Sequence, residues 1–205
     1  MAAFTASSGT AAGGGGADAP GVAGGPTRVL CLGNELISDD ALGIVAAGRL
    51  FRRLAVAGTP RPPGPSLDPA VTVRAFELPR VGPVEVVETA LSGMYLLEAV
   101  VGASRLIVVD TVVTGATDPG TVLELKESDL AGPRGGSPHS VGLLETLDLA
   151  RALCLAVPAD VVFVAVEAGD YRTVGGQMTA PVEAAVPVVV ERAMALIQSG
   201  VAVAA

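Results

Sequence analysis

Short apolar runs alternate along the chain with segments in which apolar residues recur every three or four positions. The clearest run lies in residues 105–110, where four consecutive apolar residues precede Asp110. Such a run is typical of a strand that is covered on both faces of a sheet. Residues 40–56 instead place apolar residues at helical spacing, Leu50 and Leu54 among them, which predicts an amphipathic helix.

The same patterns predict the remaining elements. Further strands are expected at residues 28–32, 71–76, 84–87, 121–125 and 161–166. Further helices are expected at residues 91–101, at 141–155 and in a last segment that ends near Ile197. Pro187 is expected in the first turn of the main part of that last helix, because an interior proline removes a hydrogen bond. Two segments rich in proline and glycine, 57–70 and 128–139, are expected to be loops.

This order of elements predicts the fold class. Strands that alternate with helices favour an α/β fold: a single-domain three-layer sandwich with a mostly parallel twisted sheet and helices on both faces. The domain is expected at residues 27–200, with 57–70 as a Pro-rich loop within it. Residues 1–26 are small, Gly-rich and non-periodic, which predicts a disordered low-complexity tail.

Composition narrows the classes of function. The chain has 205 residues, half of them hydrophobic, which is enough for one domain with a core. Its net charge of −8 argues against binding to nucleic acid or to an anionic membrane surface. It has neither a targeting signal nor an apolar run long enough to span a membrane. Cys31 and Cys154 lie in apolar segments, which predicts buried, reduced thiols and a cytoplasmic protein.

Acidic residues follow several of the expected strands, and the single histidine precedes an expected helix. The carboxyl ends of parallel strands meet at one edge of a sheet, where ligands of such folds bind. The residues expected at this edge are Asp39, Asp40, Glu88, Asp110, Glu167, Asp170 and His139. Two carboxylates and an imidazole would suit a divalent transition metal such as nickel, zinc, manganese or iron.

Each of these residues also has a structural interpretation. Ser38 or Asp39 would serve as the N-cap of the first helix, with Asp40 as a first-turn acid. Glu88 and Asp110 would form turns, and His139 would be a solvated loop residue. No HExxH, Walker A, GxGxxG or GxSxG motif offers another mechanism.

Five blocks of the sequence, taken in order, resemble the nickel-iron hydrogenase maturation endopeptidases. They are VLCLGNELISDDALGIVAAGRL (29–50), VEVVETALSGMYLLEAV (84–100), RLIVVDTVVTGATDPGTVLEL (105–125), SPHSVGLLETLDLARAL (137–153) and VVFVAVEAGDYRTVGGQMTAPVEAAVP (161–187). The order and spacing of all five blocks are similar to those of the family, and together they cover nearly everything after the tail.

The resemblance implies an α/β fold and an endopeptidase. Such an enzyme removes the C-terminal extension of a nickel-iron hydrogenase large-subunit precursor after nickel insertion. It also implies that Asp40, Glu88 and His139 contact the nickel as metal ligands and catalytic residues, with the nickel supplied by the substrate protein. A monomer is the expectation. The chain departs from the family pattern at Ala41, where a glycine is usual, and at Glu88, where the family has Asp followed by Gly-Gly.

Two other functions remain open at this point. The first is a non-catalytic nickel-binding chaperone or assembly module for the same precursor, because the same three residues would serve it. The second is a nucleotide-binding α/β protein, which the missing glycine fingerprint argues against.

Overall fold

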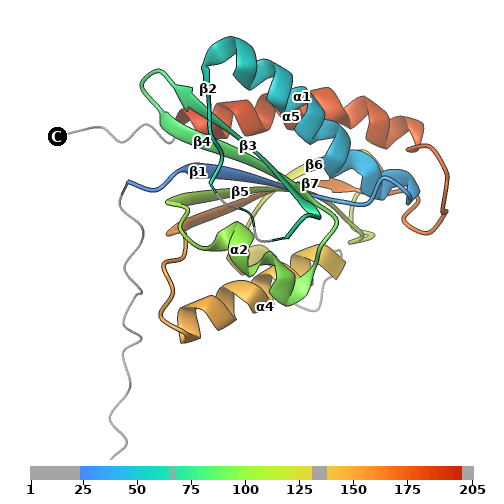
Figure 1. Cartoon of the computed structure of the whole chain (residues 1–205). Coiled ribbons are helices and arrows are strands. Elements are labelled where there is room, and N and C mark those ends of the chain that lie inside the picture. Colours follow the sequence, from blue (N-terminus) through green and yellow to red (C-terminus); the bar gives the residue numbers. More distant parts are fainter. Residues whose placement is uncertain (1–23, 65, 67, 131–137, 200–205) are drawn as a thin grey trace, which may run out of the picture.

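The computed structural model describes residues 24–64, 66, 68–130 and 138–199, which form one α/β domain (Figure 1). Its strands are β1 (Thr27–Leu32), β2 (Thr59–Arg61), β3 (Val71–Leu78), β4 (Gly82–Thr89), β5 (Arg105–Val112), β6 (Val122–Lys126) and β7 (Asp160–Glu167). Its helices are η1 (Ser38–Ala41), α1 (Leu42–Ala57), η2 (Gly93–Leu96), α2 (Leu97–Val100), α3 (Glu127–Leu130), α4 (Pro138–Ala152) and α5 (Ala180–Ser199).

The strands form one mixed sheet in the order β2-β3-β4-β1-β5-β7-β6. The central strands β4, β1, β5 and β7 run parallel, while β3 and β6 are antiparallel to their neighbours β4 and β7. The carboxyl ends of the four central strands therefore lie at the same edge of the sheet, which we call the carboxyl edge.

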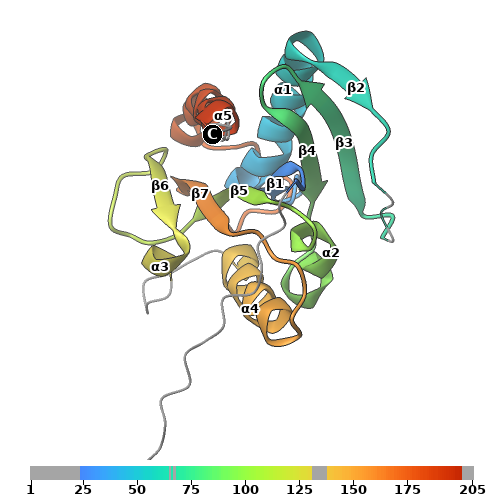
Figure 2. The same ribbon diagram turned by 90° about the vertical axis from the view of Figure 1, so that its left-hand side faces the viewer.

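Helices cover both faces of the sheet and make three layers, with α1 and α5 on one face and α2 and α4 on the other (Figure 2). Both faces of β5 are buried, which explains why its apolar run has no polar face. Ile107 and Val109 belong to the core under α1 and α5, whereas Leu106 and Val108 belong to the core under α2 and α4. The predicted α/β sandwich is confirmed, and the parallel strands form its centre.

The sequence predicted a loop over the Pro-rich segment 57–70, but part of this segment is helix and strand. Ala57 ends α1, and Thr59–Arg61 forms the short strand β2 at the sheet edge, paired antiparallel with β3. An edge strand tolerates Pro60 because one of its sides has no partner strand. Residues 65 and 67 lie outside the described residues.

The predicted loop at 128–139 also begins and ends as helix. Its first residues form the single turn α3, which Glu127 joins to α4 through an ion pair with Arg151. Its last residues, Pro138 and His139, belong to the first turn of α4. Proline is favoured there because its missing N–H has no partner in a first turn. Residues 131–137, including most of the segment before His139, lie outside the described residues.

Pro187 lies inside α5 rather than at its start, so that prediction was wrong. α5 begins at Ala180, and Pro187 faces solvent about two turns further along. Val186, Val189 and Val190 bury the opposite side of the helix in the core. Packing of this side stabilises the helix despite the hydrogen bond that Pro187 cannot donate.

The two cysteines differ from each other. Cys31 is fully buried in β1, and burial raises the pKa of its thiol. Cys154 is exposed and has a positive φ of 56°, because α4 ends at Ala152 and the chain turns there. The prediction of a buried thiol was therefore right for Cys31 and wrong for Cys154.

The predicted tail 1–26 falls mostly outside the described residues, which begin at Gly24. Its last residues are bound to the domain, since the carbonyls of Gly25 and Pro26 accept hydrogen bonds from Ser104. None of the helices in the described part of the chain combines the length and apolar character that a membrane span needs.

Candidate active site

The loop from β1 to α1 brings Asp39 and Asp40 to the carboxyl edge. After β1 ends at Leu32, the backbone folds back on itself, and the Asn34 N–H donates to the Asp40 carbonyl at 3.1 Å. Gly33 permits this close approach, because a Cβ there would lie 2.1 Å from the same carbonyl oxygen. Asp40 is thereby fixed directly above the end of a central strand.

Asp39 is a structural anchor. Its side chain is fully buried, and Oδ2 accepts hydrogen bonds from the backbone N–H groups of Gly169 and Asp170 at 2.8 and 2.7 Å. The Thr179 N–H donates to Oδ1 at 2.6 Å, and the Thr179 hydroxyl donates to Oδ2. Asp39 therefore joins the loop after β1 to the segment between β7 and α5. It is not an N-cap, and neither η1 nor α1 has a side-chain cap.

Asp40 points instead toward the single histidine. Its Oδ2 lies 3.5 Å from Nε2 of His139, and both side chains are 12% exposed. Its Oδ1 accepts a hydrogen bond from the Thr111 hydroxyl of β5 at 3.4 Å. The sequence predicted that Asp40 and His139 would lie near each other, and the structure brings them together. Thr111 was not singled out, because a threonine at a strand end has no distinctive pattern.

The other ring nitrogen of His139 is held by the backbone. Nδ1 lies 3.2 Å from the Leu91 carbonyl oxygen. A carbonyl can only accept, so Nδ1 carries the proton and Nε2 faces Asp40. The pKa of His139 is raised, first by its hydrogen bond with Asp40 and further by the charge of Asp110, whereas burial opposes the rise.

Close packing of α4 on η2 fixes the position of His139. A Cβ on Gly142 would lie 2.5 Å from the backbone nitrogen of Gly93, so only a glycine fits at this contact. One turn further, the Thr146 hydroxyl lies 2.7 Å from the carbonyl oxygens of Gly93 and Gly142. Leu91, which holds the His139 ring, lies just before η2.

Asp110 is the second carboxylate whose charge acts on His139. It lies within β5 and is 1% exposed, and its Oδ1 accepts the Thr111 N–H at 2.8 Å. It is therefore not a turn residue at the end of the strand, because β5 continues to Val112. The sequence placed Asp110 at this edge, as observed, but took it for the last residue of its strand.

Glu88 lies at the same edge, but its neighbours differ from those of Asp40 and His139. It is the penultimate residue of β4, paired in register with Cys31 of β1. Burial raises its pKa, the charge of Arg74 lowers it, and the charge of Glu35 raises it. The charges that act on Glu88 are those of Arg74 and Glu35, and within the described residues no three His, Cys, Asp or Glu side chains form a ready metal-binding group. A ligand role for Glu88 therefore stays a prediction.

The remaining edge residues have structural partners. Glu167 is buried and accepts hydrogen bonds from Thr114 and Gly115, which fixes the loop after β5. Asp170 is partly exposed, and hydrogen bonds from Thr173 and Arg172 within its own turn lower its pKa. Ala41 has φ −64°, so the departure from glycine there causes no backbone strain.

The Asp40–His139 pair fits a divalent metal ion. Two donors of one ion with bonds of about 2.0–2.2 Å lie on the order of 3 Å apart, close to the 3.5 Å between Oδ2 and Nε2. A hydrogen bond from the second ring nitrogen to a backbone carbonyl is the usual support of a metal-binding histidine. Nickel, zinc, manganese and iron all accept such oxygen and nitrogen donors.

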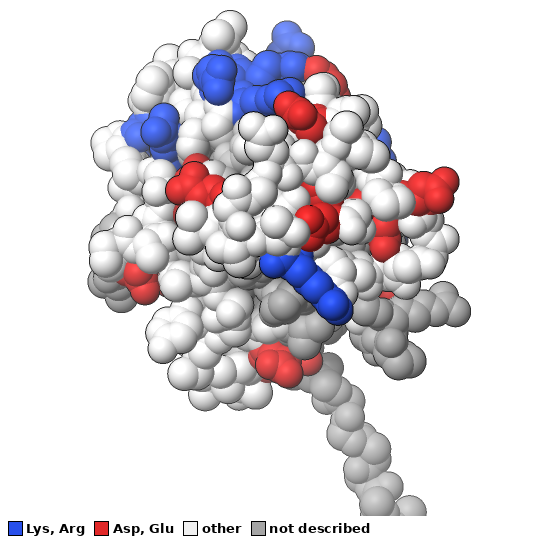
Figure 3. Space-filling model, turned by 90° about the vertical axis from the view of Figure 1, so that its right-hand side faces the viewer, with Lys and Arg blue, Asp and Glu red and all other residues white. Residues whose placement is uncertain are grey.

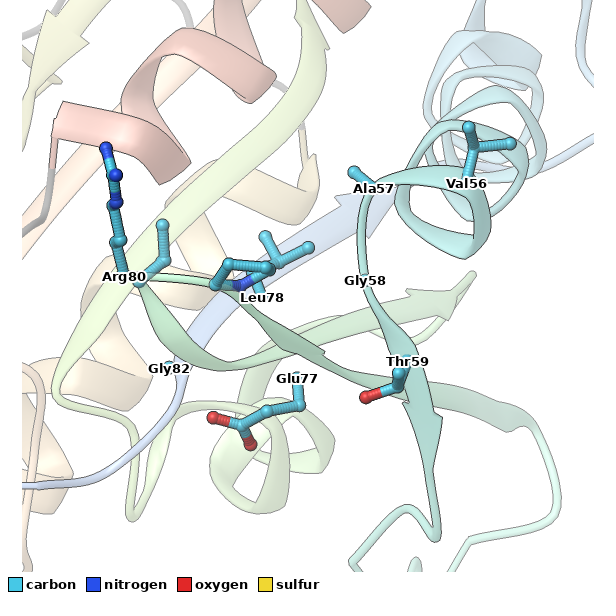
Figure 4. Close-up of a pocket in the computed structure, with 10 residues that line it drawn as sticks. Val56, Ala57, Gly58, Thr59, Glu77, Leu78, Arg80 and Gly82 are labelled. Atoms are coloured by element: carbon cyan, nitrogen blue, oxygen red, sulfur yellow. The ribbon is translucent and has the colours of Figure 1, made fainter.

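A hollow of about 760 Å³ lies elsewhere, between the end of α1 and the β3–β4 turn (Figure 4). Because β4 begins at Gly82 there, this hollow is at the opposite edge of the sheet from Asp40 and His139. Glu77 and Arg80 are the charged residues of its lining, which includes no histidine or cysteine. This lining does not offer the mixed oxygen and nitrogen donors that Asp40 and His139 offer at the carboxyl edge.

Residues 73–196 match the model of a family described as hydrogenase maturation protease. The chain is 30% identical over 181 residues to the hydrogenase expression/formation protein HupD of Rhizobium leguminosarum bv. viciae, covering 86% of this chain and 77% of that protein.

Solved structures show the same fold. The hydrogenase maturating endopeptidase HybD from E. coli superposes with a TM-score of 0.63 at 22% identity, over 85% of this chain and 93% of that one. The [NiFe] hydrogenase maturation protease HybD from Thermococcus kodakarensis gives 0.61 at 21% identity, over 84% and 99%.

Proposed function

Because this chain belongs to the hydrogenase maturation protease family, we propose that it is an endopeptidase acting on a nickel-iron hydrogenase large-subunit precursor. The reaction is hydrolysis of one peptide bond, which releases the C-terminal extension of the precursor after nickel insertion. The observation that carries this proposal is the pair formed by Asp40 and His139 at the carboxyl edge, 3.5 Å apart and mostly shielded from water.

Asp40 and His139 are the residues proposed to contact the nickel. Asp40 supplies a carboxylate oxygen, and His139 supplies Nε2, because its Nδ1–H is engaged by the Leu91 carbonyl. Asp110 is the further carboxylate we propose for the site, since it is buried and its charge acts on the His139 ring. Glu88 is the alternative third ligand, and its raised pKa supports a role near the edge.

The nickel is proposed to be part of the substrate protein. Asp40 and His139 then recognise a metal that the precursor already carries, and the precursor without nickel is not cut. The bound metal would polarise the scissile carbonyl group, and a carboxylate at the edge would accept the proton of the attacking water. Because recognition of the precursor would require its nickel, cleavage would occur only after nickel insertion.

We also propose that the protein acts in the cytoplasm as a monomer. Cys31 and Cys154 are both free thiols, and they lie in separate environments, one buried and one exposed. Unpaired cysteines are usual in a reducing compartment.

The test is the intact mass of a cognate large-subunit precursor after incubation with the protein. Nickel-loaded and nickel-free precursors are run in parallel, with His139→Ala as the inactive control. One loss of mass from the C-terminus, seen only with nickel and the wild-type protein, is the expected result.

Two outcomes would contradict the proposal. Equal cleavage of the nickel-free precursor would remove the metal check. An unchanged mass together with a stable complex would favour a non-catalytic nickel-binding chaperone for the same precursor.

A further inference from the structure

Positive charge is concentrated in one part of this acidic protein. Residues 41–76 contain five arginines and a single acidic residue, Asp68, although the whole chain has a net charge of −8. The arginines of this arginine face are Arg49, Arg52 and Arg53 of α1, Arg61 of β2 and Arg74 of β3. Figure 3 shows the larger group of Lys and Arg side chains at the top of the molecule, the end at which Figure 1 draws α1.

A groove of about 400 Å³ lies within this face, between α1 and the strands β2 and β3. Apolar side chains, Phe51 and Phe76 among them, contribute to its lining, together with the three arginines Arg52, Arg61 and Arg74. No acidic residue lines it. A second groove, of about 570 Å³, also borders Arg52 and is lined by Arg49, Arg53 and Glu191, the last two of which form an ion pair.

The arginines of the first groove are held in place while their charge stays accessible. The guanidinium group of Arg74 stacks 4.3 Å above the centre of the Phe51 ring, which orders it without neutralising it. Arg52 Nε donates to the Gly48 carbonyl of its own helix. Arg61 pairs with Glu77 at 2.7 Å, but both side chains remain nearly half exposed, so a partner's carboxylate can exchange with Glu77.

This groove leads toward the carboxyl edge. Arg74 is in register with Val86 of β4, and Thr72 is in register with Glu88. Arg74 is therefore two residues from the level of Glu88, about 7 Å at the usual strand rise. A polypeptide that reaches the site over β3 and β4 passes the arginine groove.

From this placement we infer that the groove between α1, β2 and β3 is a docking site for an acidic, apolar-containing segment of the protein substrate, separate from the site that cuts it. This inference rests on the proposed function, because it takes the precursor as the partner. Arg52, Arg61 and Arg74 pair with carboxylates of the segment, and the floor around Phe76 accepts an apolar side chain. Opposite charges across such an interface mainly speed association and make it sensitive to salt.

The experiment compares two charge reversals in the full-length protein with nickel-loaded precursor as the probe. Arg52→Glu/Arg61→Glu changes the groove, and Lys126→Glu/Arg192→Glu makes the same charge change on β6 and α5 at the other end of the sheet. We expect the groove variant to raise KM and the Kd for the precursor at least tenfold, with kcat unchanged. The control variant should stay within about twofold of the wild-type protein. Thermal melting confirms that both variants fold.

The wild-type protein gives a second test that needs no substitution. Raising NaCl from 50 to 300 mM should weaken its binding to the precursor several-fold. The groove variant should lose most of this dependence, because the charges that cause it are gone.

The outcomes separate docking from cleavage. If both variants bind alike, or if wild-type binding is insensitive to salt, the docking site is wrong, whether or not the precursor is cut. If the precursor binds through the arginines but is never cut, docking stands and the proposed activity falls. Self-association at low salt that disappears in the groove variant would instead assign the groove to a second copy of the chain.

Discussion

The neighbouring residues Asp39 and Asp40 have different roles: Asp39 holds the loop in place, and Asp40 is proposed to act in the site. Asp39 is fully buried and accepts hydrogen bonds from residues 169, 170 and 179, which lie far along the chain. Asp40, one residue later, faces His139 and Thr111 at the carboxyl edge. Their spacing in sequence is minimal, but the 3-10 turn η1 directs the two carboxylates to different partners.

Substitution at these two positions should therefore separate stability from activity. Asp39→Ala removes the acceptor of three partly buried backbone N–H groups, and we expect it to lower the free energy of unfolding by about 3 kcal/mol. Asp40→Asn keeps the shape of the side chain, and we expect it to abolish cleavage while changing stability by less than about 1 kcal/mol. Urea unfolding and the mass assay measure the two effects. A stable Asp39→Ala protein would show that these hydrogen bonds contribute little.

The single histidine permits a direct titration. Because Asp40 and Asp110 favour the imidazolium form, the pKa of His139 should lie above its ordinary value of 6.5. Asp40→Asn removes the largest cause and should lower this pKa, whereas Asp148→Asn, an exposed acid on the same helix, should leave it unchanged. NMR of the only imidazole resonances, in metal-free buffer, measures each value.

The sign of the effect on stability follows from the same shift. A raised pKa means that the folded state binds the proton more tightly than the unfolded state. His139 therefore contributes its full stabilisation below pH 6.5 and loses it as pH rises through the raised pKa. Metal contact at Nε2 requires the deprotonated ring, so cleavage should rise over the pH range in which this stabilisation is lost. Equal pKa values of His139 in the wild-type and Asp40→Asn proteins would contradict the contact between Asp40 and His139.

At this scale the sequence predicted part of the site. The carboxyl-edge rule together with the family resemblance identified Asp40 and His139, and the structure brings them together. The resemblance selected Glu88 as the third ligand, and this choice stays a prediction; the apolar runs alone did not favour Glu88 over Asp110, because both acids follow such a run. The distinction depends on the face of the sheet: Asp110 continues the side of β5 that Leu106 and Val108 turn toward α4, while Glu88 follows Val84 and Val86 on the α1 side.

At the scale of elements, contacts between helices explain which glycines are required. Gly142 of α4 meets the backbone of Gly93, whereas Gly48 of α1 has no atom within 4 Å of the place where a Cβ would stand. The same substitution should therefore have opposite effects at the two positions. Both glycines lie inside helices, so their intrinsic helix propensities are comparable.

Gly142→Ala should push α4 away from η2, lower the melting temperature and displace His139, which lies one turn earlier. Gly48→Ala should stabilise the protein by about 0.5–1 kcal/mol, because alanine is the better helix former and nothing obstructs it. Calorimetry measures both, and the His139 titration shows whether the ring moves in Gly142→Ala. An unchanged melting temperature of Gly142→Ala would show that α4 and η2 can move apart without loss of stability.

The elements themselves were largely predictable, and the exceptions share a cause. The apolar runs of β1, β5 and β7 and the helical spacing of α1 identified these elements near their observed bounds. Pro60 and Pro187 misled the prediction, because local rules for proline exclude strands and helix interiors. Pairing of β2 with β3 and packing of α5 on the core outweigh those local preferences.

At the scale of the whole molecule, we assign functions to two separate regions of the acidic chain. The carboxyl edge holds Asp40, Asp110 and His139, and the arginine face lies on α1, β2 and β3. A net charge of −8 concealed this second region, because composition averages over the surface. Its position became evident only when the fold placed Arg52 and Arg74 in the lining of one groove, with Arg74 over the ring of Phe51.

We propose that Asp40, Asp110 and His139 together form the site that acts on the precursor. The most direct measurement is the initial rate of cleavage of nickel-loaded precursor by Asp110→Asn and by Glu88→Gln, each confirmed to be folded. We predict that Asp110→Asn lowers the rate at least a hundredfold and that Glu88→Gln keeps it within a few-fold of the wild-type rate. The reverse order would contradict the claim and make Glu88 the third residue of the site.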